Sequence, residues 1–256
     1  MIIFNEQQYI EDIINRNQVS VNKIGKTRIM TLLNIYYKND INWFCNVLSI
    51  CQRIYPLFFE EKYGDKIKKI HEKVIKDNIE FRPYKQTIIY QSDINKIQSL
   101  SNEKLQKLYF TMIVLARWYN NEGWIGAKDR IGMDFVFQLA NVRASRQDKC
   151  QMYYSLYDAR YIQYSKKNSS LNAKVNLEHD DKIVMTISVY KNLGNQYLDK
   201  YKDGWKMCTV CGKIYKIKNW DYSSKYCSNC AKEIVSQQKK EWDNQNKVKN
   251  PKKPND

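Results

Sequence analysis

Four cysteines in the last fifth of the chain constrain its fold more than any other feature. Cys208 and Cys211 are separated by two residues, as are Cys227 and Cys230, and fifteen residues lie between the pairs. Four soft thiolates at this spacing favour one tetrahedral Zn2+ ion. Gly212 directly follows the first pair, where a backbone that bends around a metal often needs a positive φ. Because four thiolates leave no open position for water, we expect the zinc to be structural.

The zinc ribbon that these cysteines predict, over residues 204–232, is itself basic and aromatic. The stretch KIYKIKNWDYSSKY between the pairs is typical of a short hairpin. Its lysines could bind phosphates while Trp220 and Tyr222 stack on bases. The same aromatic side chains could instead form the small ribbon core, and ribbons also dock onto proteins. The candidate nucleic-acid contacts of this segment are Lys213, Lys216 and Lys218.

The charge of the chain indicates a polyanionic partner. Its 256 residues include 43 Lys and Arg against 27 Asp and Glu, a formal net charge of +16, and 43% of them are hydrophobic, which is ample for folded cores. Nucleic acid is the first partner to expect and an acidic protein surface the second. An AT-rich coding bias toward Lys, Asn, Ile and Tyr is the remaining explanation.

The sequence contains neither a membrane span nor a signal peptide core. Such a span needs a run of about 18 apolar residues, which is absent. We therefore expect a cytoplasmic protein with no membrane partner. In that reducing compartment the paired cysteines favour a metal over disulfides.

Residues 1–85 have apolar side chains at the three-and-four spacing of helices, which predicts a helical domain built as a small bundle. Pro56 is expected to end the third helix or start the next segment. Gly64 and Asp65 predict a break before a basic amphipathic helix. The extended, polar stretch 81–93 predicts a linker to the next domain.

Residues 95–200 are typical of a winged helix. A strong helix begins in SNEKLQKLYF, and two short helices follow in MDFVFQLANVRASRQDKCQMYYSLYD, separated by the turn NVRA. RYIQYS and NAKVNLE predict two strands joined by KKNSS, and KIVMTISVY predicts a third strand. On the second short helix, the residues expected to face the core are Cys150, Tyr153, Leu156 and Tyr157.

The predicted fold class is mainly α with small β elements. It comprises an N-terminal helical bundle, a central winged helix, a C-terminal zinc ribbon and a basic, partly disordered tail over residues 233–256. The tail begins as a helix and passes into a Lys, Asn and Pro sequence that cannot bury a core.

The charges of the winged-helix segment lie where such folds contact a duplex. The turn and the start of the second short helix present cations and amides to phosphates and base edges, and the wing tip presents two lysines to a flanking groove. The competing interpretation is a protein-docking module with a solvated basic rim. The candidate contacts are Arg143, Arg146, Gln147, Lys149, Gln151, Lys166 and Lys167.

From about residue 95, the stretches INKIQSLSNEKLQKLYFTMIVLARW, FQLANVRASRQDK, YDARYIQYS and CTVCGKIY with KYCSNCAKE resemble a group of uncharacterised proteins from Gram-positive bacteria and their phages. The resemblance implies a winged-helix-like segment paired with a zinc ribbon, and the four cysteines carry over position by position. It implies no activity. The N-terminal region is similar to small helical domains attached to phage and plasmid primases, but no primase carboxylate motif follows it.

Three classes of function fit this sequence. The first is a non-enzymatic protein of phage or mobile-element type that binds nucleic acid, with double-stranded DNA preferred, in replication, transcription control or interference with a host system. The second is an adaptor or inhibitor that uses its basic surface to bind a host nucleic-acid enzyme such as a defence nuclease. The third is a nuclease with scattered carboxylates. The sequence lacks a phosphate-binding glycine loop, a metalloprotease His and Glu pair and a nucleophile elbow, so we assign no catalytic residue.

Overall fold

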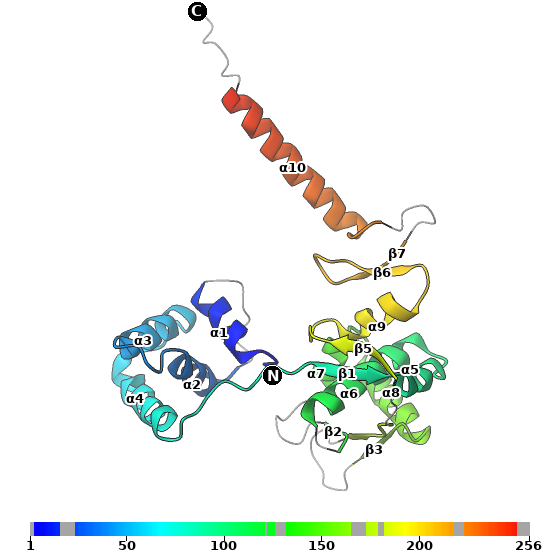
Figure 1. Cartoon of the computed structure of the whole chain (residues 1–256), viewed down its shortest axis with the longest axis horizontal. Coiled ribbons are helices and arrows are strands. Elements are labelled where there is room, and N and C mark those ends of the chain that lie inside the picture. The colour runs from blue at the N-terminus through cyan, green and yellow to red at the C-terminus, as the bar shows by residue number, and fades with distance from the viewer. Residues whose placement is uncertain are drawn as a thin grey trace, which may run out of the picture. The chain divides into compact units, whose positions relative to one another are not determined.

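The fold is mainly helical with three small antiparallel sheets, as the sequence predicts (Figure 1). The described part holds ten helices and seven strands, and none of these helices is long and apolar enough to cross a membrane. The chain divides into two compact units, Met1–Gln86 and Thr87–Asp256. The computed structural model describes residues 3–15, 24–120, 122–125, 132–164, 173–178, 182–217 and 223–249.

In its described residues, the first unit consists of four helices around one apolar core. Residues that recur at helical spacing, among them Ile10, Leu33, Val47 and Ile67, are fully buried there. Asn5 caps the first helix by accepting a hydrogen bond from the Gln8 backbone N–H. The helices are α1 (Glu6–Ile14), α2 (Lys26–Tyr36), α3 (Trp43–Ile54) and α4 (Glu60–Lys76).

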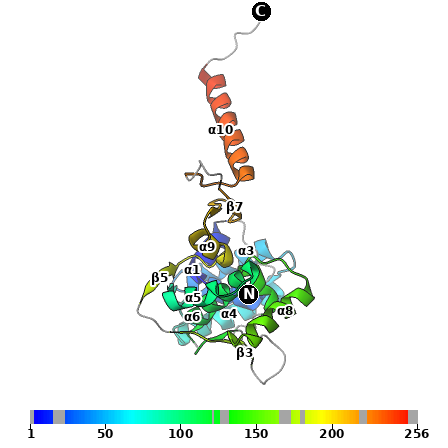
Figure 2. The ribbon, with the colours of Figure 1, turned by 90° about the vertical axis from the view of Figure 1, so that its right-hand side faces the viewer.

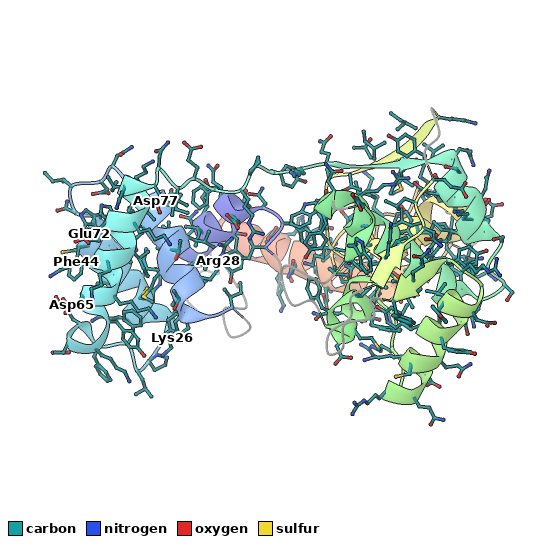
Figure 3. All side chains as sticks on the ribbon, turned by 90° about the horizontal axis from the view of Figure 1, so that it is seen from below. Lys26, Arg28, Phe44, Asp65, Glu72 and Asp77 are labelled. Carbon is teal, nitrogen blue, oxygen red and sulfur yellow. The ribbon has the colours of Figure 1, made fainter. Side chains whose placement is uncertain are left out.

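Helix α4 runs without interruption through Gly64 and Asp65, so the predicted break is wrong. Gly64 is buried, and a Cβ there would make only ordinary van der Waals contact, at 3.6 Å from Phe44 Cζ. Phe44, which is labelled in Figure 3, packs under Lys68 of α4, whose Nζ is 5.2 Å from the ring centroid. A glycine within a helix costs only about 1 kcal/mol relative to Ala, and α4 remains helical while it packs against α2 and α3.

The second unit begins within the stretch predicted as a linker. Only residues 81–86 of that stretch lack helix and strand. Strand β1 (Thr87–Tyr90) pairs antiparallel with β5 (Ile183–Ile187), a partner almost a hundred residues away, and α5 (Gln91–Gln98) follows at once. The linker prediction failed for residues 87–93 because the pairing that orders β1 is not local.

Helix α6 (Glu103–Tyr119) is the centre of the second unit. Ten consecutive side chains, from Lys107 to Ala116, are buried. Helix α5, the short helices α7 (Met133–Leu139) and α8 (Arg146–Asp158), and α9 (Leu193–Tyr201) all pack against it. The apolar character of nearly every face of α6 thus reflects partners on all sides.

Three short strands form a sheet in the order β2-β4-β3, all antiparallel. They are β2 (Trp124–Ile125), β3 (Ile162–Tyr164) and β4 (Ala173–Val175), and α8 lies next to β3 (Figure 2). The pairing of β3 with β4 is as predicted. The strand predicted in KIVMTISVY is present as β5, but it pairs with β1 in a separate sheet, and β2 is the third strand beside β4.

The C-terminal segment consists of a hairpin and a long helix. Strands β6 (Trp205–Met207) and β7 (Ile214–Lys216) pair antiparallel on either side of the first cysteine pair, whereas the sequence predicted a hairpin between the two pairs. Helix α10 (Ser228–Lys249) is continuous (Figure 2). The predicted tail is therefore helical as far as Lys249, and residues 250–256 lie outside the described part.

Candidate metal centre and basic surface

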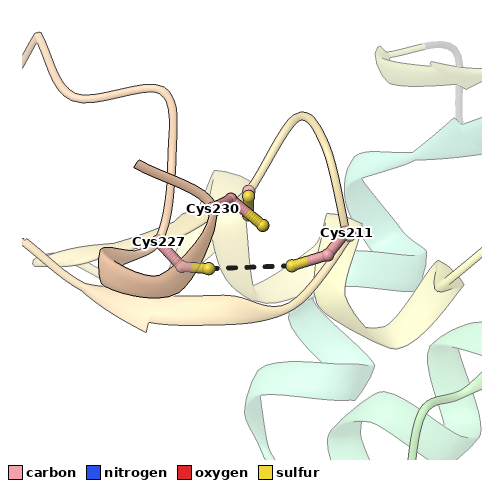
Figure 4. A group of neighbouring side chains, drawn as sticks. Cys211, Cys227 and Cys230 are labelled. Carbon is pink, nitrogen blue, oxygen red and sulfur yellow. Dashed lines mark hydrogen bonds between the residues drawn. The ribbon is translucent and has the colours of Figure 1, made fainter. Parts of the chain in front are cut away.

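The four predicted metal ligands converge on one point. Cys208 and Cys211 lie in the loop between β6 and β7, Cys227 directly precedes α10, and Cys230 belongs to its first turn (Figure 4). All four sulfur atoms lie within 4.8 Å of one another, and the Cys211 and Cys227 sulfurs are 3.7 Å apart. A tetrahedron with metal–sulfur bonds of about 2.3 Å has sulfur–sulfur edges of about 3.8 Å. The thiols therefore form a possible four-cysteine metal site.

The backbone around the first pair is shaped to present both sulfurs inward. Cys208 N–H donates to the Lys213 carbonyl at 2.8 Å, and Gly212 N–H donates to the Cys208 carbonyl at 2.9 Å. Gly212 has a φ of +67°, the left-handed conformation predicted for it. These contacts turn the chain back on itself between the two ligands.

Two of the four thiols are already disposed to ionise. Burial opposes ionisation of Cys208, but the backbone N–H groups of Cys211, Cys227 and Val210 outweigh it and lower its pKa to about 6. The backbone N–H of Cys230 lowers the pKa of Cys227. The pKa of Cys230 is raised to about 12, first because of its contact with the Cys211 thiol. Four clustered thiolates would repel each other, and a bound cation offsets that repulsion.

In the described part of the cysteine segment, the buried apolar cluster is small. It contains Cys208, Cys227 and Cys230, with Tyr215 packed against them. Tyr215 donates its hydroxyl hydrogen to the Ser224 carbonyl at 2.8 Å, which ties β7 to the segment before the second pair. In small segments of this kind, a metal bound by four thiolates can supply folding free energy.

The second candidate surface is the exposed face of α8 and the turn before it. Ser145 accepts a hydrogen bond from Asp148 N–H, and Asp148 accepts one from Ser145 N–H, which forms the predicted cap. The turn is closed by Asn141, with a φ of +51°. Four of the predicted contacts lie exposed on this surface: Arg143, Arg146, Gln147 and Gln151.

Lys149 differs from these four residues. Its side chain is 20% exposed, and its Nζ lies 2.6 Å from Asp134 Oδ1 of α7 and 5.5 Å from the Phe137 ring centroid. The ammonium group is engaged within the protein, where it joins α7 to α8. Its predicted contact with nucleic acid would compete with this ion pair.

The structure also corrects which α8 side chains face the core. Tyr153 and Leu156 are buried as predicted, whereas Cys150 is exposed and Tyr157 is 47% exposed. Tyr154 is 57% exposed, and the Tyr157 ring lies 5.1 Å from the ring of Tyr164 on β3. These three tyrosines add aromatic surface that the sequence had not assigned to the site, because helical spacing alone does not show which side the core occupies.

The remaining predicted contacts fall into two groups. Lys213 and Lys216 are exposed beside the cysteine loop. Lys166, Lys167 and Lys218 lie outside the described residues, as do Trp220 and Tyr222.

Comparisons of the chain with protein-family models, with curated proteins and with solved structures find no match.

Proposed function

We propose that the elements from α6 to β4 form a winged helix that binds double-stranded DNA. The order helix, strand, two short helices and two strands supports this assignment, as does the placement of β4 between β2 and β3 in one sheet. In such a fold the second short helix enters the major groove and the strand pair lies against a flanking groove. Helix α8 takes the first role and the pair β3 and β4 the second.

The observation that carries this proposal is the exposed start of α8. Arg143 and Arg146 form no salt bridge with any residue in the described ranges, so both guanidinium groups are available to phosphates or base edges. Gln147 and Gln151 follow one turn apart on the same exposed face, and an amide can bond an adenine edge through two atoms.

The cysteine segment has a structural role in this proposal. It binds one Zn2+ ion through Cys208, Cys211, Cys227 and Cys230 as a zinc ribbon, since four thiolates suit zinc best. The ion supplies the cross-link that holds the hairpin, and Lys213 and Lys216 extend the basic surface. The proposed protein is non-enzymatic and of phage or mobile-element type, acting in replication, transcription control or interference with a host system.

The test is a fluorescence anisotropy titration of labelled duplex DNA, single-stranded DNA and RNA at several salt concentrations. The variant Arg143→Ala/Arg146→Ala removes two cations from the start of α8. The matched control Lys69→Ala/Lys73→Ala removes two exposed cations from α4, one turn apart. We expect the wild type to bind the duplex tightly. The slope of log affinity against log salt concentration should be about 1.8 smaller in magnitude for the first variant, because each phosphate contact contributes about 0.9 to that slope.

Equal loss of affinity in both double variants would contradict the assignment to α8, since it would show a response to net charge alone. Absence of duplex binding by the wild type would refute the proposed function and favour a protein partner. Capture of that partner from a nuclease-treated bacterial lysate would then identify an adaptor or inhibitor.

A further inference from the structure

A hollow of about 460 Å³ lies where three parts of the second unit meet. Its walls are the first turns of α6, the turn between α7 and α8, and the start of β7. The side chains that matter for its chemistry are Glu103, Lys104, Lys107, Arg143 and Lys213.

Lys107 is a buried cation at the wall of this hollow. Its side chain is 7% exposed, and its Nζ donates a hydrogen bond to the Asn141 carbonyl at 2.9 Å. Within the described ranges it has no carboxylate partner, and an ammonium group has two further hydrogens to donate. Burial lowers the pKa of Lys107 to about 8, so the amine stays mainly protonated at neutral pH. An uncompensated buried charge is costly, which indicates that an anion completes this site.

The position of Lys107 is set by close packing. Helix α9 crosses its side chain at Gly194, where a Cβ would lie 2.8 Å from Lys107 Cβ and 2.9 Å from Lys107 Cε. Only a glycine leaves room for the lysine stem at this crossing. The ammonium group is therefore held in place, unlike the end of a surface lysine.

The other charges around the hollow are also mainly positive. Lys104, Arg143 and Lys213 are exposed at its rim and form no salt bridge in the described part of the chain. Glu103 is the one carboxylate among the lining residues, and it forms an ion pair with Lys202. The cations come from three separate elements, an arrangement that suits an anion with several acceptor oxygens.

We propose that this hollow binds a phosphate group, with Lys107 at its wall and Lys104, Arg143 and Lys213 at its rim. The tetrahedral oxygens of the phosphate can accept hydrogen bonds from α6, from the turn before α8 and from the start of β7 at the same time. That the phosphate belongs to the backbone of bound DNA rests on the proposed function. The binding of free phosphate by the hollow does not rest on the proposed function.

The first experiment measures binding of inorganic phosphate to the full, zinc-loaded chain by 31P NMR line broadening, at constant ionic strength set with chloride. Lys107→Met keeps the apolar stem and removes the charge, and Lys213→Ala changes an exposed side chain, so folding does not depend on it. Lys239→Met removes an exposed cation of α10 as the control. We expect about tenfold weaker binding in the first two variants and no change in the third.

The second experiment identifies the source of the phosphate. If it belongs to the DNA backbone, Lys213→Ala weakens duplex binding and lowers the salt slope by about one. If Lys213→Ala weakens phosphate binding but leaves duplex binding unchanged, the ligand is a small phosphate compound.

No phosphate binding by the wild type, or equal binding by the wild type and both hollow variants, would overturn this inference whatever the DNA titration shows. Phosphate binding that depends on Lys107, in a protein that fails to bind duplex DNA, would support the hollow and refute only the proposed function.

Discussion

Replacement of Asp93 by Ala removes one half of a buried ion pair that holds α5 to α6. Asp93 is 1% exposed and Arg117 is 9% exposed. Arg117 donates through Nη2 to Asp93 Oδ1 at 2.8 Å and through Nε to Asp93 Oδ2 at 3.0 Å. The Tyr90 backbone N–H donates to the same carboxylate at 3.1 Å, so the group also orders the end of β1. The two-point geometry makes this a strong contact.

The expected cost follows from the guanidinium charge that the substitution leaves without its partner. Breaking a buried pair in this way costs about 3–5 kcal/mol, more than the pair itself contributes relative to apolar residues. In a unit of this size each kcal/mol corresponds to about 2–4 °C in Tm. We therefore expect Asp93→Ala to lower the Tm of the second unit by about 6–20 °C. The double variant Asp93→Ala/Arg117→Met removes both charges and should recover part of the loss.

The assay is thermal unfolding followed by circular dichroism, with Lys96→Met as the matched control. Lys96 forms an ion pair of 2.5 Å with Glu178 in the same unit, but these side chains are 26% and 51% exposed. Exposed pairs contribute about 0–1 kcal/mol, so the control should shift Tm little. If Asp93→Ala costs no more than Lys96→Met, or if the double variant is less stable than Asp93→Ala, the argument from burial is wrong.

Removal of the proposed zinc by a chelator, or Cys230→Ser, should unfold the hairpin β6–β7 and leave the core around α6 intact, because the described buried cluster of the cysteine segment consists of three of the cysteines with Tyr215 packed against them. Hydrogen exchange of the hairpin amides measures this, and unchanged protection would contradict it. Lys107 has a folded pKa of about 8 against an ordinary value of 10.5, so the cost of burying its charge is fully present below pH 8 and is relieved as pH rises toward 10.5. In phosphate-free buffer, denaturant titrations should show the free energy of unfolding of the wild type rising by about 1–2 kcal/mol relative to that of Lys107→Met between pH 8 and pH 10.5, after allowance for solvent screening. If the unfolding free energies of the two proteins change with pH in parallel, this prediction is wrong. Gly194→Ala should destabilise by about 1–3 kcal/mol, because the new methyl group meets a backbone carbonyl and the lysine stem. Gly132→Ala is the control, because a Cβ at that position would have nothing within 4 Å. Thermal unfolding compares the two variants, and equal Tm values for Gly194→Ala and Gly132→Ala would refute the steric argument.

Features that depend on neighbours in sequence were predicted well. The two C-x2-C pairs identified the possible metal site, because two ligands three positions apart face the same ion whatever surrounds them. The cap at Ser145 and the positive φ of Gly212 could likewise be predicted from the sequence, since each depends on a contact only a few residues away. The helical content of the first unit followed from apolar spacing for the same reason.

Features that depend on partners distant in the sequence were not predicted. The break predicted at Gly64 does not occur, because α4 packs against two other helices, α2 and α3, that lie elsewhere in the sequence. The two-residue strand β2 is too short to show alternation, and it forms only because β4 offers it an edge.

By itself, then, the sequence determined the helical class, the four thiols of the possible metal site and the basic start of α8, because local spacing and side-chain chemistry suffice for each. Only the tertiary structure decided that Lys149 is engaged with Asp134. It also brought Lys107, Arg143 and Lys213 to one hollow from three elements. The charges of these residues are visible in the sequence, but whether a charge meets a carboxylate, water or an open cavity depends on contacts that the chain makes only when folded.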